Sequence, residues 1–255
     1  TNKIVFVDGL TRTGKAMLNK LLLGFDSLSS IQFIPIIEQL IPMYAYNKIS
    51  REAISSCMRL YLNENFYNYK LSRNLNFRMN DLTSIHNSNN SVDFYKNLNK
   101  EDGDKVIDEL LEENIIFQFQ THDILTHYRK FLDLGIEANI IELFRNPIDT
   151  IHSWYVRGWG NRFDNEDPRN GTTLFKYNDN TIPHYVVGNE EKYILYNEME
   201  KCVFMHNLLL KKSIEEYNRL DKNKKNVILL LKYEDLLIEP DIQIKKISRF
   251  LNVKE

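Results

Sequence analysis

The chain has 255 residues, of which 43% are hydrophobic, and this is enough apolar material for the core of one large α/β domain. Its formal net charge of -2 excludes the overall basic surface that would attract nucleic acid, and no apolar run approaches the roughly 20 residues of a membrane span. Two cysteines, Cys57 and Cys202, are too few for a disulfide framework, so we expect a cytoplasmic protein. The sequence begins at Thr1 rather than Met, which leaves open a short leader, a tag remnant or a removed anchor segment before it.

Four short apolar runs have the length and composition of buried parallel strands. They lie at residues 4–7, 115–119, 139–144 and 227–231, and each precedes a polar turn and a helical pattern. This alternation predicts a doubly wound α/β fold with a central parallel sheet. With the loop and the family resemblance described below, we expect a P-loop-like fold of three α/β/α layers with additional helices. We expect residues 1–255 to form a single domain.

A helical insertion is predicted over about residues 35–113, between the first two strands. Its helices are expected at 35–46, 50–72 and 103–113, with an Asn-rich loop around 87–90. Such an insertion packs beside the sheet and forms one wall of a pocket.

The second half of the chain begins with a well-marked helix. Asn146 is a capping residue and Pro147 suits the first helical position, so a helix is predicted to run to about Arg157. Residues 158–188 lack periodicity and are rich in Gly, Asn and aromatic side chains, which is typical of a substrate-binding loop. Further helices are predicted over about 189–220 and 241–251.

The first strand leads into a glycine-bounded loop with the spacing G-x-x-x-x-G-K, formed by Gly9, Gly14 and Lys15. A loop of this kind directs backbone N–H groups and a helix N-terminus at an anion. Ala16 stands where a nucleoside-triphosphate enzyme needs a hydroxyl to bind magnesium. The later strands end in Arg145 and Lys232 rather than in a metal-binding carboxylate, so the sequence predicts an anion site that uses no metal.

Arg145 and Ser153 are suited to a second, separate phosphate site. Arg145 lies at the carboxyl end of the third strand and Ser153 on the helix that follows. The alternative for Arg145 is a structural ion pair with Asp149.

Three segments resemble the sulfotransferase family that uses 3'-phosphoadenosine 5'-phosphosulfate (PAPS). Residues 9–17 are similar to its 5'-phosphosulfate loop, P-[KR]-[ST]-G-T-T, and residues 145–153 to its 3'-phosphate element, R-[ND]-[PA]-x-D-x-x-x-S. Residues 232–253 are similar to its Y-E-D-L…P…I…F-L-G-[VI] stretch. The resemblance therefore covers nearly the whole chain.

The resemblance implies transfer of a sulfuryl group from PAPS to a hydroxyl or amine of a small-molecule or glycan acceptor, with no metal. Arg12 would be the catalytic cation, and Arg145 and Ser153 would bind the 3'-phosphate. Lys15 and Ala16 stand where the family commonly has two threonines. The loop that would bind the 5' end consists of Gly9, Leu10, Thr11, Arg12, Thr13, Gly14, Lys15 and Ala16.

Two residues compete for the role of general base. His122 lies in Gln120-Thr121-His122, which resembles the K-T-H element of the cytosolic branch, although Gln120 replaces its lysine. Glu38 lies where other branches of the family place a catalytic glutamate. His122 is the preferred base and Glu38 the alternative.

Two other functions remain open from the sequence. A P-loop phosphoryl-transfer kinase would require magnesium and bind ATP tightly. A non-catalytic nucleotide-binding module would bind the nucleotide without forming a sulfated product. The sequence gives no indication of the oligomeric state.

Overall fold

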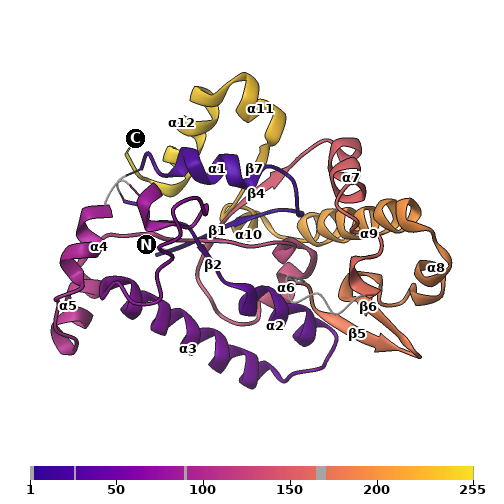
Figure 1. Ribbon diagram of the computed structural model, residues 1–255, viewed down its shortest axis with the longest axis horizontal. Helices are drawn as coiled ribbons and strands as arrows, with labels where there is room; N and C mark the ends of the chain where they lie inside the picture. Colours follow the sequence, from indigo (N-terminus) through magenta and orange to yellow (C-terminus); the bar gives the residue numbers. More distant parts are fainter. Residues whose placement is uncertain (1–2, 26, 89–90, 165–170, 255) are drawn as a thin grey trace.

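A five-stranded parallel sheet forms the centre of the protein (Figure 1). The computed structural model describes residues 3–25, 27–88, 91–164 and 171–254. The strand order is β2-β3-β1-β4-β7. The strands are β1 (Ile4–Asp8), β2 (Gln32–Phe33), β3 (Phe117–Gln120), β4 (Asn139–Phe144) and β7 (Ile228–Lys232). This arrangement confirms the predicted α/β fold with a central parallel sheet.

Strand β1 is buried along its whole length because it pairs with β3 on one side and with β4 on the other. Its side chains alternate between two apolar clusters, with Ile4 and Phe6 in one and Val5 and Val7 in the other. The two clusters lie on opposite faces of the sheet. A strand covered on both faces must be apolar throughout, which explains its continuous hydrophobic sequence.

Helices cover both faces of the sheet (Figure 1). Side chains of α1 (Lys15–Leu22), α11 (Tyr233–Ile238) and α12 (Pro240–Leu251) belong to the cluster of Val5 and Val7. Side chains of α2 (Pro35–Ala45), α3 (Arg51–Lys70) and α6 (Tyr128–Leu132) belong to the cluster of Ile4 and Phe6. The predicted three layers are therefore present.

The chain between β2 and β3 is mainly helical. After α2 and α3 come the short 3-10 helix η1 (Ile85–Asn87), α4 (Ser91–Asn97) and α5 (Asp104–Glu112). The Ser50 side chain accepts a hydrogen bond from the N–H of Ala53 and so fixes the start of α3. Helix α4 follows the segment predicted as an Asn-rich loop, of which residues 89 and 90 lie outside the described part of the chain.

A third apolar cluster lies beyond the sheet and includes Trp154, Phe163, Tyr185 and Met205. It joins α7 (Pro147–Tyr155) to α9 (Glu198–Asn218) and to the 158–188 segment. That segment contains η3 (Arg162–Asp164), an antiparallel hairpin of β5 (Leu174–Tyr177) and β6 (Asn180–Pro183), and η4 (His184–Val186). Residues 165–170 of the predicted substrate loop lie outside the described residues.

The single helix predicted over 189–220 is wrong, because the chain forms two helices there, α8 (Glu190–Leu195) and α9. The chain is extended at Tyr196 and Asn197, with ψ values of 146° and 173°. The Asn197 side chain accepts from the N–H of Glu200, and the Glu200 carboxylate accepts from the N–H of Asn197. This capping box starts a new helix at Glu198 and explains the interruption.

The remaining elements are η2 (Ile124–His127), which follows β3, and α10 (Lys222–Lys225), which precedes β7. Within the described ranges, no helix has the length and apolar character needed to cross a membrane. Cys57 is exposed, Cys202 is buried, and both are free thiols.

Candidate active site

The loop between β1 and α1 depends on two glycines. Gly9 has φ +124°, and a Cβ there would lie 2.1 Å from the carbonyl oxygen of Leu143. Gly14 has φ +103°, and a Cβ there would lie 2.2 Å from the ring of Tyr233. Arg12, between them, also has a positive φ, of 73°. The loop therefore packs tightly against β4 and α11, and only glycine fits at its two ends.

Several backbone N–H groups at the end of this loop are free to bind an anion. The amide and the hydroxyl of Thr13 both donate to the carbonyl of Leu10, at 3.3 and 2.9 Å, which holds the turn closed. The N–H groups of Gly14, Lys15 and Ala16 donate to no acceptor in the described part of the chain. They lie at the N-terminus of α1, where the helix dipole also favours negative charge.

The Lys15 side chain points back into the loop. Its Nζ donates to the carbonyl of Gly9 and, at 3.0 Å, to the carbonyl of Leu10, and the side chain is buried. Burial lowers the pKa of Lys15, while Asp8 and Asp123 favour its charged form. The Lys15 side chain thus supports the loop from inside, and its amide remains available.

Two arginines contact Ser153, and a third contacts the backbone of Arg12. Ser153 Oγ lies 3.2 Å from Nε of Arg12 and 3.1 Å from Nη1 of Arg157, and Arg145 Nη1 lies 3.5 Å from the carbonyl oxygen of Arg12. Burial and the positive charges of Arg157 and Arg145 lower the pKa of Arg12. Arg145 also forms the alternative ion pair with Asp149, at a long 3.8 Å. An anion bound here would offset the repulsion among the guanidinium groups.

Residues of the third sequence motif hold the two anion-binding elements together. The Tyr233 ring packs against Gly14 and lies under the Arg145 guanidinium, 4.7 Å from the ring centre. The Glu234 carboxylate accepts from the N–H of Asn146 at 2.9 Å, and the Asn146 side chain caps α7 by accepting from Ile148 at 2.9 Å. The predicted cap is therefore present, and α11 connects the 9–14 loop with the start of α7.

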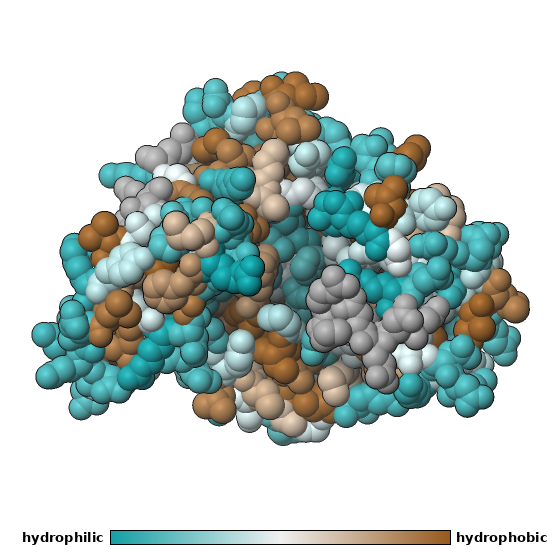
Figure 2. All heavy atoms as spheres, in the orientation of Figure 1, coloured by the Kyte–Doolittle hydropathy of each residue, from teal (hydrophilic) through white to brown (hydrophobic). Residues whose placement is uncertain are grey.

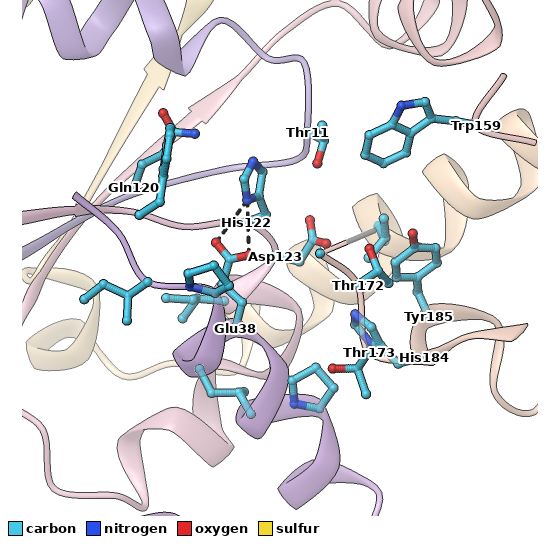
Figure 3. Close-up of a pocket in the computed structure, with 18 of the residues that line it drawn as sticks. Thr11, Glu38, Gln120, His122, Asp123, Trp159, Thr172, Thr173, His184 and Tyr185 are labelled. Atoms are coloured by element: carbon cyan, nitrogen blue, oxygen red, sulfur yellow. Dashed lines mark hydrogen bonds and ion pairs between the residues drawn. The ribbon is translucent and has the colours of Figure 1, made fainter. Parts of the chain in front are cut away.

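The two candidate bases lie together. His122 follows β3, Glu38 comes from α2, and His122 Nδ1 lies 3.0 and 3.2 Å from the two carboxylate oxygens (Figure 3). Burial and the charge of Lys15 lower the pKa of His122 to about 3, so the imidazole stays neutral. Burial and nearby Asp8 raise the pKa of Glu38. Nδ1 is the ring nitrogen that faces Glu38, and Figure 3 shows Nε2 on the side of the ring away from Glu38.

This pair borders a cavity of about 330 Å³. The face seen in Figure 2 is hollowed near its middle. Thr11 lines the cavity, and its carbonyl accepts from the indole N–H of Trp154 at 2.8 Å, so the 9–14 loop forms part of the cavity wall. The other residues lining it include Phe33, Ile34, Pro35, Ile41, Gln120, Asp123, Trp159, Arg162, Thr172, His184 and Tyr185.

The structure adds residues that sequence reasoning missed. Arg157 lies four residues after Ser153, two residues beyond the end of α7, and this spacing was the available signal. Asp123 directly follows His122 and also lines the cavity, and burial together with Asp8 raises its pKa to about 8. Among the described residues, no group of three or more His, Cys, Asp or Glu side chains is arranged to hold a metal ion.

The chain was compared with curated protein sequences, solved structures and family models. No curated protein sequence matches the chain. Its fold resembles a sulfotransferase domain from the curacin biosynthetic pathway, with 17% identity, 99% of this chain and 74% of that one covered, and a TM-score of 0.49. A sulfotransferase domain from the Synechococcus PCC 7002 olefin synthase has 14% identity, coverage of 99% and 74%, and a TM-score of 0.47. A sulfotransferase from Alicyclobacillus acidocaldarius has 12% identity, coverage of 98% and 81%, and a TM-score of 0.44.

The family model described as "Sulfotransferase domain" matches residues 5–255. Because this match spans nearly all of the sequence, the chain belongs to the sulfotransferase-domain family.

Proposed function

We propose that this protein is an enzyme that transfers a sulfuryl group from PAPS to a hydroxyl or amine acceptor. One observation carries the proposal: the free amides at the start of α1, the cluster around Ser153 and the cavity beside His122 all meet at Arg12 or its neighbours in the 9–14 loop. A donor with two anionic ends and an acceptor with a reactive hydroxyl need this combination of groups.

The residues fit the donor at both ends. The N–H groups of Gly14, Lys15 and Ala16, with the Arg12 guanidinium, are suited to the 5'-phosphosulfate. Arg145 and Ser153 are suited to the 3'-phosphate, and Arg157 adds a third cation beside them. The contact of 3.2 Å between Arg12 Nε and Ser153 Oγ supports a single ligand that reaches both sets. Bound PAPS supplies the sulfuryl group and leaves as 3'-phosphoadenosine 5'-phosphate (PAP).

The Glu38–His122 pair is suited to activate the acceptor. His122 Nε2 takes the proton of the acceptor hydroxyl, and Glu38 fixes the ring through Nδ1 and stabilises the charge that forms on it. In this proposal His122 is the base and Glu38 its positioning partner. The two residues that compete for one role in the sequence thus take different roles in one pair. As the acceptor oxygen bonds to sulfur, the bond from sulfur to the bridging oxygen of the donor breaks, and Arg12 would stabilise the negative charge that grows on that leaving oxygen.

The acceptor site is the cavity of about 330 Å³, which has the volume of a small ligand site. Its aromatic and aliphatic lining suits a small molecule or a single sugar of a glycan. The 158–188 segment contributes Trp159, Thr172 and Tyr185 to this lining.

Calorimetric titration with PAP, and separately with ATP and magnesium, tests the donor assignment. PAP should bind more tightly, and Arg145→Ala and Ser153→Ala should each weaken it at least about tenfold through the loss of a charge-assisted hydrogen bond. Arg78→Ala is the matched control, because the Arg78 side chain is 83% exposed. Tighter binding of ATP with magnesium would favour the kinase alternative.

Mass spectrometry after incubation with PAPS and a panel of alcohols, phenols, amines and sugars tests the reaction. A product heavier by one sulfuryl group is expected, and its formation should require His122. Tight PAP binding without product from any acceptor would favour the non-catalytic nucleotide-binding module.

A further inference from the structure

Asp123 occupies an unusual position between β3 and η2. Its backbone is left-handed, with φ 61° and ψ 14°, and it directly precedes η2. An aspartate at such a position normally accepts a hydrogen bond from the following backbone, but the Asp123 side chain makes none there. It lines the cavity instead (Figure 3).

The Asp123 carboxyl group has an unmet hydrogen-bonding capacity. Its Oδ1 is buried and has no hydrogen-bond partner among the described residues. The nearby cation does not fill this role, because Lys15 Nζ donates to the carbonyls of Gly9 and Leu10. A buried acceptor without a partner is costly to the fold, and retaining it requires a compensating role.

The surroundings of Asp123 divide the cavity into two kinds of wall. Ile34, Pro35 and Ile41, at or just before α2, which also carries Glu38, give the cavity apolar lining. Figure 3 shows Thr172, His184 and Tyr185 on the opposite side of the cavity from Glu38. His184 Nδ1 is also buried without a partner within the described ranges. The cavity thus offers unsatisfied polar atoms in addition to the pair that would activate the acceptor.

We propose that Asp123 accepts a hydrogen bond from a second polar group of the acceptor, a hydroxyl or an ammonium next to the hydroxyl that is sulfated. This inference rests on the proposed sulfotransfer in the same cavity. His122 and Asp123 both line the cavity and lie beside each other in it (Figure 3), so an acceptor whose reacting oxygen meets His122 brings its neighbouring substituent toward Asp123. The enzyme therefore selects diols, sugars or amino alcohols over acceptors with a single hydroxyl.

The raised pKa of Asp123 is compatible with either a hydroxyl or an ammonium as the second polar group of the acceptor. Burial and nearby Asp8 raise the pKa of Asp123 to about 8, so the carboxyl is mostly protonated at neutral pH and can donate as well as accept. An ammonium group would favour the ionised form. Comparing an acceptor that carries a second hydroxyl with one that carries an ammonium group therefore decides which of the two groups binds Asp123.

Three acceptors with one carbon skeleton test the inference: 2-phenylethanol, 1-phenyl-1,2-ethanediol and 2-amino-2-phenylethanol. With the wild-type enzyme and PAPS, kcat/KM for the diol or the amino alcohol should exceed that for 2-phenylethanol at least about tenfold, because only these compounds satisfy Asp123. A preference for the diol identifies a hydroxyl as the second group, and a preference for the amino alcohol identifies an ammonium.

Substitution then assigns the preference to Asp123. Asp123→Ala should bring the ratio of the bifunctional to the monofunctional kcat/KM close to one. Asp123→Asn keeps a hydrogen-bond acceptor, so it should retain part of a preference for the diol and lose a preference for the amino alcohol. Asp108→Asn removes an exposed carboxylate on α5 and is the matched control.

Calorimetry with PAP-saturated protein and the same three compounds gives a readout that needs no turnover. Equal affinities for all three, or a ratio that Asp123→Ala leaves unchanged, would overturn the role of Asp123. PAP binding by the wild-type protein is measured first, because it distinguishes a failure of the proposed sulfotransferase function from a failure of the role of Asp123. Lost PAP binding refutes the proposed function, whereas intact PAP binding with no discrimination refutes the further inference alone.

Discussion

Replacing Gly14 with alanine tests how the 9–14 loop is held in place. At φ +103° an alanine is strained by about 1–2 kcal/mol, and its Cβ would lie 2.2 and 2.4 Å from two atoms of the Tyr233 ring. Overpacking of this kind costs about 1–3 kcal/mol more. We therefore expect Gly14→Ala to lower the free energy of unfolding by about 2–5 kcal/mol, measured by urea denaturation.

The same substitution should also impair donor binding. The Tyr233 ring supports the Arg145 guanidinium at 4.7 Å, so moving the ring displaces a residue assigned to the 3'-phosphate. PAP affinity, measured by calorimetry, should fall at least about tenfold, as for loss of one charge-assisted hydrogen bond.

Two controls separate strain from overlap. Gly135 also has a positive φ, of 70°, but a Cβ there would meet nothing within 4 Å, so Gly135→Ala should cost only about 1 kcal/mol and leave PAP binding intact. In a Tyr233→Ala background the overlap is gone, and Gly14→Ala should cost no more than its strain. Equal effects of Gly14→Ala and Gly135→Ala on stability and on PAP affinity would refute the reasoning.

Three further predictions concern other elements. Asn197→Ala removes the capping box of α9 and should lower the free energy of unfolding by about 1 kcal/mol in urea denaturation, whereas the exposed Asn63→Ala should not. Asp123→Asn should gain stability over the wild type as pH rises from about 4 to 8, by up to about 1.4 kcal/mol per pH unit. The reason is that the folded wild type, with its Asp123 pKa of about 8, keeps a proton that the unfolded chain releases. The check is urea denaturation of both proteins at pH 5 and pH 8, and an equal difference between their free energies of unfolding at the two pH values would contradict this. Protonation of His122 should give no acid limb near pH 6.5 in the kcat/KM profile, since its pKa is lowered to about 3; an acid limb near 6.5 that persists in Glu38→Gln, where the raised pKa of Glu38 plays no part, would argue against His122 as the base.

Much of the fold was predictable because its central strands carry their own signal. The run at 139–144 has the bounds of β4, and the runs at 4–7, 115–119 and 227–231 match β1, β3 and β7 within two residues at either end. Strand β1 and the middle of β4 are buried, and their apolar residues follow one another, which is the signal of a strand covered on both faces. Strand β2 has only two residues at the edge of the sheet and produces no such run.

The remaining elements depend on local signals that hydrophobic periodicity does not detect. The break before α9 lies inside a stretch whose amphipathic pattern continues across it, although Asn197 and Glu200 have the spacing of a capping box. The β5–β6 hairpin turns at Asn178, whose φ of 51° suits the tight turns that Asn favours.

The candidate site was predictable where a residue's role depends on its own loop or helix. Arg12, Arg145 and Ser153 were assigned from short motifs, and the structure brings them together, while their roles stay predictions. The contact between Glu38 and His122 joins residues 84 positions apart, so it depends on how α2 packs beside β3. The inward turn of Lys15 likewise depends on tertiary surroundings, in this case a buried set of acidic side chains.

Thr11 gives the two halves of the site a common boundary. Thr11 lines the cavity and lies in the same loop that leads to the free amides at the start of α1. The indole N–H of Trp154 donates to the Thr11 carbonyl at 2.8 Å. A ligand that orders this loop from the nucleotide side also shapes the wall that the other substrate meets. Thermodynamic reciprocity then requires each substrate to change the affinity of the other by the same factor, whichever of them arrives first.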